Sequence, residues 1–232
     1  MPKIIAVIPT YNEAGNIQIV IDRILTLKLD IGVLVVDDFS PDGTYKIVEE
    51  ISKKDKRVNL LVRKDKRGRG WAGIDGFKVA LELGADMIVE MDGDLSHSPK
   101  YIPAFVEAAE QYDVVIGSRY VEGGKDEQRT FLRNIISEFA RKYLALVLGV
   151  KLKDPASGFR LFKREVMVKI LPHLKARDPF VVTESLHYIR KYGFRITEVP
   201  IEFMARGAGV SKLKPSMLIQ YLFRVWKLKL NR

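Results

Sequence analysis

Val89-Glu90-Met91-Asp92-Gly93-Asp94-Leu95-Ser96-His97 is the stretch around which the fold can be read. Apolar residues 87–89 lead into it and predict a buried strand that runs out into two aspartates separated by a glycine. Side chains at i and i+2 of an extended segment point to the same side, so Asp92 and Asp94 can face one ligand. Because adjacent carboxylates repel each other, a cation between them is favoured, and Mg²⁺ or Mn²⁺ would suit these oxygen ligands. An ordinary acidic turn after a strand is the alternative interpretation.

The same pattern, an apolar strand followed by polar residues, occurs elsewhere in the first half of the chain. Apolar, β-branched runs at residues 3–9, 31–36, 58–62 and 114–116 predict buried strands, and helical spacing between them predicts helices. This alternation favours an α/β fold with a mostly parallel central sheet flanked by helices. In open α/β sheets, ligands bind at the carboxyl ends of the strands. Four polar groups follow predicted strands, and we expect them to form one site: residues 10–13, Asp37 with Asp38, Asp92 with Asp94, and Ser118 with Arg119.

The second half of the chain is less regular. We expect a long helix over residues 129–149, a loop over 154–160, a helix over 180–192, a strand over 196–203 and a basic loop over 204–212. The apolar part of the long helix, residues 143–150, could lie in the core or face a membrane, and the core is the default expectation. An amphipathic helix over 217–230 carries Tyr221 and Trp226 among Arg and Lys residues. It could pack on the domain or lie on an anionic membrane surface.

Composition narrows the classes of partner. The 232 residues include no cysteine, carry a net charge of +10, and are 47% hydrophobic, which indicates a globular protein with a polyanionic partner. No apolar run reaches the roughly 18 residues of a membrane-spanning helix and no signal peptide is visible, so we expect a cytoplasmic protein. A nucleic-acid partner is not expected, because the basic stretch over residues 63–69 contains no aromatic residue.

Taken together, several motifs resemble those of the family 2 glycosyltransferases, and most closely the dolichyl-phosphate (polyprenyl-phosphate) mannosyltransferases. The motifs are residues 8–13 (IPTYNE), 35–44 (VVDDFSPDGT), 92–97 (DGDLSH), 117–119 (GSR), 157–160 (SGFR) and 206–213. The resemblance spans nearly the whole chain and implies a glycosyltransferase A type fold over residues 1–213. The helix over 214–232 would then be a membrane-surface attachment, which the expected lipid acceptor favours.

The resemblance also implies roles for individual residues. Those expected to bind the nucleotide sugar are Pro9, Tyr11, Glu13, Asp38, Asp92, Gly93, Asp94, Ser96, Arg119, Arg206 and Lys212. Among them, Asp92 and Asp94 would hold the metal, while Asp94, Arg119, Arg206 and Lys212 would act on the departing diphosphate. Ser96 is at a position where some members have a metal-reaching glutamine, and its shorter side chain argues against direct ligation. Arg133 and Ser137 match the positions that would meet the acceptor phosphate.

The implied activity is inverting, metal-dependent transfer of mannose from GDP-mannose to dolichyl or polyprenyl phosphate at the cytoplasmic face of a membrane. A metal with Arg and Lys would stabilise the departing diphosphate, and an already anionic acceptor phosphate requires no strong general base. A UDP-sugar donor, such as UDP-glucose, is the alternative within this class. From another class, the chain could be a non-catalytic nucleotide-binding and membrane-docking module.

At a few positions, a purely structural role is the alternative to a role in binding or catalysis. We predict that His97 is a hydrogen-bonding residue, that Asp37 is more structural than Asp38, and that Asp42 and Thr44 serve a turn and a helix cap. Glu184 is interpreted either as orienting a substrate or as a solvated helix residue. Residues 64–69 are either a phosphate-binding patch or, as we favour, an exposed basic loop.

Overall fold

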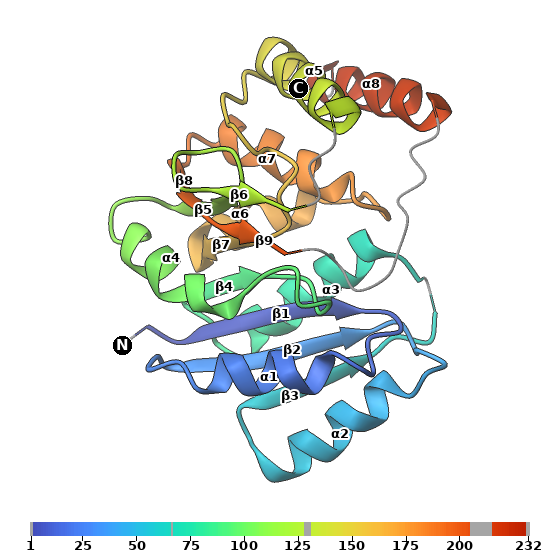
Figure 1. Cartoon of the computed structure of the whole chain (residues 1–232), viewed down its shortest axis with the longest axis vertical. Helices are drawn as coiled ribbons and strands as arrows, with labels where there is room; N and C mark the ends of the chain where they lie inside the picture. The colour runs from blue at the N-terminus through green and yellow to red at the C-terminus, as the bar shows by residue number, and fades with distance from the viewer. Residues whose placement is uncertain (1, 66, 128–130, 205–214, 231–232) are drawn as a thin grey trace.

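A mostly parallel sheet forms the centre of the protein (Figure 1), as seen in a computed structural model that describes residues 2–65, 67–127, 131–204 and 215–230. In the described residues, a seven-stranded sheet has the order β3-β2-β1-β4-β7-β5-β8, and β6 pairs with β9 in a second, two-stranded sheet. The large sheet comprises β3 (Val58–Val62), β2 (Ile31–Asp37), β1 (Ile4–Thr10), β4 (Met87–Glu90), β7 (Arg160–Lys163), β5 (Val114–Ser118) and β8 (Ile196–Pro200). The small sheet comprises β6 (Lys125–Asp126) and β9 (Glu202–Phe203).

Helices cover both faces of the large sheet. One face packs against α1 (Ile17–Leu25), α2 (Thr44–Lys54) and α4 (Ile102–Ala108), and the other against α3 (Arg69–Glu82), α6 (Arg164–Ile170) and α7 (Val181–Lys191). Side chains alternate between the two faces: Ile5 and Val7 of β1 join one core cluster, and Ile4, Ala6 and Ile8 join the other. All residues of β1 are buried, which explains its continuous apolar sequence. The predicted α/β architecture is confirmed.

The second half of the chain departs from the sequence expectation in several places, and most clearly at strand β7. The sequence predicted a loop over residues 154–160 and no strand directly after it, but residues 160–163 form β7, which pairs antiparallel with both β4 and β5. Leu161 and Phe162 of β7 are buried, one in each core cluster, so this short apolar pair belongs to a central strand. The expected strand over 196–203 divides into β8 and β9, which belong to different sheets.

The last helix packs on the domain through one face. Helices α5 (Phe131–Leu148) and α8 (Pro215–Leu230) lie side by side (Figure 1), and the Tyr143 hydroxyl donates a hydrogen bond to the Leu222 carbonyl at 2.9 Å. Val225 is buried. Of residues 143–150 of the predicted core segment, Leu144 and Val147 join the core as expected, but Leu146 is 81% exposed. In the described part of the chain, no helix combines the length and apolar character needed to cross a membrane.

Candidate active site

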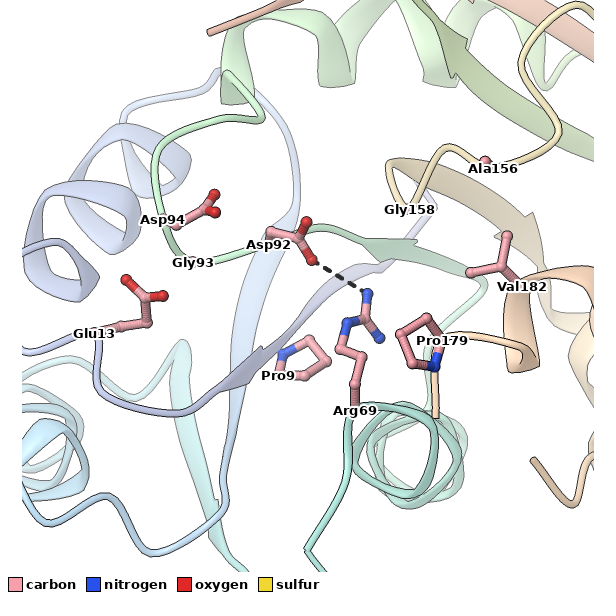
Figure 2. A pocket seen from close by; sticks show the side chains of 10 residues that line it. All are labelled: Pro9, Glu13, Arg69, Asp92, Gly93, Asp94, Ala156, Gly158, Pro179 and Val182. Carbon is pink, nitrogen blue, oxygen red and sulfur yellow. Dashed lines mark hydrogen bonds and ion pairs between the residues drawn. The ribbon is translucent and has the colours of Figure 1, made fainter. Parts of the chain in front are cut away.

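A cavity of about 370 Å³ lies beyond the carboxyl end of β4 (Figure 2). Figure 2 shows Asp92 and Asp94 on the segment that follows this strand, with Glu13 and Arg69 approaching from other elements. The residues lining the cavity are Pro9, Glu13, Arg69, Asp92, Gly93, Asp94, Ala156, Gly158, Pro179 and Val182. Of the four polar groups that the strand pattern placed in one site, those that follow β1 and β4 meet at the cavity. Within the described ranges, the groups that follow β2 and β5, Asp37 with Asp38 and Ser118 with Arg119, are not among its lining residues.

The turn after β4 fixes both aspartates. Leu95 adopts a left-handed backbone conformation with φ of 65°, which folds the chain back so that Ser96 meets Asp94. The Ser96 hydroxyl and backbone N–H donate to Asp94 Oδ1 at 2.5 and 3.1 Å. A Cβ at Gly93 would lie 3.1 Å from Thr10 Cγ2, a tight contact, so glycine suits this close approach to β1. Ser96 therefore orients a carboxylate of the site.

His97 fixes the backbone at Asp92, the other aspartate of the pair. Its Nδ1 accepts a hydrogen bond from the Asp92 backbone N–H at 3.0 Å, and its ring stacks on Phe159. Burial lowers the pKa of His97, and this effect outweighs the attraction of Asp92 and Asp94 for a protonated ring. The neutral ring is the form that can accept at Nδ1, so the prediction of a hydrogen-bonding histidine is confirmed.

The residues that follow β1 and β2 lie at the carboxyl ends of these neighbouring strands. Asp37 accepts hydrogen bonds from the Thr10 hydroxyl at 2.8 Å and from the Ser40 N–H and hydroxyl, each at 2.7 Å, which confirms its structural role. Asp38 is 5% exposed, and its carboxylate is held by Arg63 and by the Gly68 N–H. Tyr11 is exposed beside the guanidinium of Arg67.

The prediction that Asp42 and Thr44 serve a turn and a helix cap holds for the turn, but the N-cap of α2 is Gly43, which makes no side-chain cap hydrogen bond. Asp42 accepts hydrogen bonds from the Thr44 N–H at 3.0 Å and from the Thr44 hydroxyl at 2.6 Å, at the start of α2. Asp42 also accepts from the Ala14 N–H at 3.0 Å, and the Thr44 hydroxyl accepts from the Glu13 N–H at 2.9 Å. Although burial raises the pKa of Asp42, the hydrogen bonds from Thr44 and Ala14 lower it overall. This turn therefore fixes the backbone that carries Glu13.

Arg69 is a charged residue of the cavity that the favoured interpretation of the sequence placed in an exposed loop. At the first position of α3, it donates to Glu90 Oε1 at 2.8 Å and to Asp92 Oδ1 at 3.3 Å. The basic stretch was expected to be an exposed loop, and that holds for Lys64 and Arg67 but is wrong for Arg69. The signal available in the sequence was Glu90, a carboxylate inside an apolar strand that must have a cationic partner.

Arg119 follows β5 and is engaged by acidic side chains. Its guanidinium donates to Asp154 at 2.7 and 2.8 Å and lies 3.5 Å from Asp126. Burial alone would lower its pKa, but Asp154 raises it overall. The ring of Phe203 lies between Arg119 and His97, 5.1 Å from the guanidinium and 5.4 Å from the imidazole ring. Arg119 is thus held toward Asp154, and it is not among the described residues that line the cavity.

The expected acceptor residues belong to α5. Ser137 is exposed and hydrogen-bonds Tyr120, which neighbours Arg119 in the chain, so it lies on the Arg119 side of the site. Arg206 and Lys212 lie outside the described residues, as does the side chain of Arg133. Glu184 is neither solvated nor in the cavity: it is buried, and its Oε2 accepts from the Lys175 and Ala176 N–H groups at 2.8 and 2.9 Å. Both interpretations of Glu184 are therefore replaced by a role in holding the loop before α7.

The carboxylates of the cavity suit a hard divalent cation. Asp92 and Asp94 offer oxygen donors, which Mg²⁺ and Mn²⁺ prefer. In the part of the chain that the structure describes, no group of three or more His, Asp or Glu side chains could hold a metal ion. Two carboxylates leave most positions of a six-coordinate ion to phosphate oxygens and water, as is usual where such an ion binds with a phosphate-bearing substrate.

Comparisons with known proteins identify related sequences along the whole chain. Residues 5–171 match the family described as Glycosyl transferase family 2. A polyprenol monophosphomannose synthase from Mycolicibacterium smegmatis is 37% identical over 229 residues, which cover 96% of this chain and 85% of the relative. A dolichol-phosphate mannosyltransferase from Pyrococcus furiosus is 37% identical over 233 residues, which cover 97% of this chain and 63% of the relative.

A solved structure shares the fold. The glucosyl-3-phosphoglycerate synthase from Mycobacterium tuberculosis, crystallised with Mn²⁺, UDP and glucosyl-3-phosphoglycerate, superposes with a TM-score of 0.68 at 20% sequence identity. The match covers 99% of this chain and 78% of that one. This likeness confirms the predicted glycosyltransferase A type fold.

Proposed function

Because the chain belongs to glycosyl transferase family 2, we propose that it transfers mannose from GDP-mannose to a polyprenyl or dolichyl phosphate. The observation that carries this proposal is the pair Asp92 and Asp94, fixed at the end of β4 over a cavity that could accept a sugar diphosphate. The choice of mannose and of a lipid phosphate is supported by the relatives, whose names specify both.

The cavity residues suggest how the donor would be held. Pro9, Glu13 and Gly93 would border its nucleoside, with Tyr11 and Asp38 on the outer edge after β1 and β2. Asp92 and Asp94 would hold Mg²⁺ or Mn²⁺, which when bound supplies positive charge that stabilises the departing diphosphate. Arg119, Arg206 and Lys212 are proposed to add charge on the same side, with Arg133 and Ser137 toward the acceptor.

The proposed transfer is one displacement at the anomeric carbon. A phosphate oxygen of the acceptor forms the new bond to that carbon as its bond to the GDP oxygen breaks, and the electron pair leaves with GDP. The attacking oxygen is already anionic, so no residue needs to remove a proton from it. Attack opposite the leaving group inverts the carbon, so an α-linked donor gives a β-linked lipid product.

A partition assay tests the donor and the acceptor together. The protein is incubated with Mn²⁺, a short polyprenyl phosphate, and radiolabelled GDP-mannose or UDP-glucose, and the organic phase is counted. We expect label in that phase from GDP-mannose alone. Label from UDP-glucose alone would replace the proposed donor, and no label from either would favour a non-catalytic nucleotide-binding module.

We also propose that the exposed face of α8, formed by Phe223, Trp226 and Leu230, attaches the protein to a membrane surface, and that residues 1–213 form the catalytic domain. Phe223, Trp226 and Leu230 recur at helical spacing on α8 and are 77%, 50% and 74% exposed, while Lys227 and Lys229 lie beside them. Such a face, apolar with flanking cations, suits the cytoplasmic surface of an anionic membrane. The opposite face packs on the domain through Val225, so the two alternatives for this helix are compatible.

Changing Phe223 and Leu230 together to glutamate should weaken binding to anionic phospholipid vesicles about tenfold or more, because two apolar side chains no longer enter the interface. Co-sedimentation with the vesicles measures the effect. Val168→Glu is the matched control, since Val168 is 54% exposed but belongs to α6. Unchanged vesicle binding by the double variant would mean that α8 serves packing alone.

A further inference from the structure

Arg69 places a fixed positive charge against one of the two cavity aspartates. Figure 2 shows its guanidinium extending from α3 toward Asp92, and the ion pair is 3.3 Å long. The side chain of Asp92 is 24% exposed and that of Arg69 is 25% exposed, so solvent screens the pair only in part. The carboxylate that would hold a divalent cation is therefore already paired with a monovalent one.

The backbone around Arg69 explains why the guanidinium lies there. A Cβ at Gly70 would lie 2.2 Å from the Ala176 carbonyl oxygen and 2.6 Å from that of Asp178, so only glycine allows the loop 176–178 to pack here. The Gly70 N–H donates to the Arg177 carbonyl at 3.0 Å, which fixes the start of α3. Arg69 thus starts from a rigid position and projects into the cavity.

The far side of the guanidinium is held by a buried carboxylate. Glu90 is fully buried and accepts from Arg69 at 2.8 Å on one oxygen and from Arg160 at 2.6 Å on the other. Although burial alone would lower the pKa of Arg69, Glu90 and Asp92 raise it, so the charge persists at any physiological pH. Since Glu90 remains paired on both oxygens, Arg69 can release Asp92 and stay anchored.

We propose that Arg69 couples divalent-cation binding to diphosphate binding. Arg69 competes with the cation for Asp92, and the diphosphate of the nucleotide sugar takes over the guanidinium, which frees Asp92 for the cation. Arginine suits this exchange because its planar donors can serve Glu90 and a phosphate oxygen at once. The inference rests on the proposed nucleotide-sugar donor but requires only its diphosphate.

The test is a titration with Mn²⁺ alone, with GDP, and with GMP, followed by the electron paramagnetic resonance signal of free Mn²⁺. For the unaltered protein we expect GDP to tighten Mn²⁺ binding about tenfold or more, and GMP to do so far less, since typical couplings are about 5–150-fold. In Arg69→Met, Mn²⁺ alone should bind about tenfold more tightly, and the additional effect of GDP should shrink.

Two further variants make the outcome specific. Arg69→Lys keeps the charge but cannot pair with Glu90 and Asp92 in the same way, so we expect its affinity for Mn²⁺ alone to lie between the other two. Arg57→Met removes an exposed arginine that pairs with Asp55 and should titrate like the unaltered protein. Circular dichroism confirms that each variant is folded.

The results separate this inference from the proposed function. If Arg69→Met and Arg69→Lys bind Mn²⁺ alone no more tightly than the unaltered protein, Arg69 does not compete for Asp92 and the inference is wrong, whatever the transfer assay shows. If the coupling appears with GDP but no mannose reaches lipid in the partition assay, the inference stands and the proposed function fails.

Discussion

Asp94→Ala should abolish sugar transfer, with a loss of about 10³-fold or more, while the protein remains folded. The proposal makes Asp94 one of two carboxylates that hold the cation, and a metal ion supplies several kcal/mol of charge stabilisation to a departing group. The side chain lies at the cavity rather than in either apolar core, so its removal leaves the packing intact. Mannose transfer to polyprenyl phosphate is the measurement, with thermal unfolding as the check on the fold.

A second variant separates the carboxylate charge from its hydrogen bonds. Asp94→Asn keeps an oxygen that can accept from the Ser96 hydroxyl and N–H, but it removes the charge. We expect Asp94→Asn to fold like the unaltered protein and to lose nearly as much activity as Asp94→Ala. Asp22→Ala, at an exposed aspartate on α1, is the control and should retain full activity. Full activity of Asp94→Asn would contradict the assignment of Asp94 to the metal.

The first half of the fold could be predicted because its local and global signals agree. Residues 4–8 of β1 are apolar throughout, since helices cover both faces of the strand, and helical spacing in α1 places its apolar residues on one face. The polar residues after β1 and β4 then had to meet at one edge of a parallel sheet. Lining of the cavity by Glu13, Asp92 and Asp94 follows directly from that geometry.

Residues that depend on long-range pairing could not be predicted in the same way. Strand β7 is short and antiparallel, and its place between β4 and β5 depends on partners about 45 and 70 residues earlier in the chain. Arg69 appeared to belong to a basic loop because its partners, Glu90 and Asp92, come from another element. The partners of the Glu184 carboxylate are backbone N–H groups of Lys175 and Ala176, which no side-chain pattern on α7 reveals.

Glu90→Gln should destabilise the protein by about 3–5 kcal/mol, because it leaves buried Arg160 without its counter-charge. Arg160 is 1% exposed and already has one buried nitrogen, Nε, without a hydrogen-bond partner in the structure. The free energy of unfolding, from denaturation by urea, measures the effect. Combining Glu90→Leu with Arg160→Met should recover much of the loss, since a buried ion pair can often be replaced by apolar side chains. Glu50→Gln, at an exposed ion pair on α2, should show no measurable change.

The difference in unfolding free energy between the unaltered protein and Glu90→Gln should also depend on pH. Burial alone would raise the pKa of Glu90, but Arg160 and Arg69 outweigh it and lower the pKa below its ordinary value. The folded state therefore favours the ionised carboxylate, and its stabilisation is complete above the pKa of the unfolded chain and is lost as the pH falls through the folded pKa. The difference in unfolding free energy between the unaltered protein and Glu90→Gln should thus be largest near neutral pH and shrink in acid. A difference that stays constant into acid would mean that the charge of Glu90 does not stabilise the fold, and that the anchor of Arg69 is a neutral hydrogen bond.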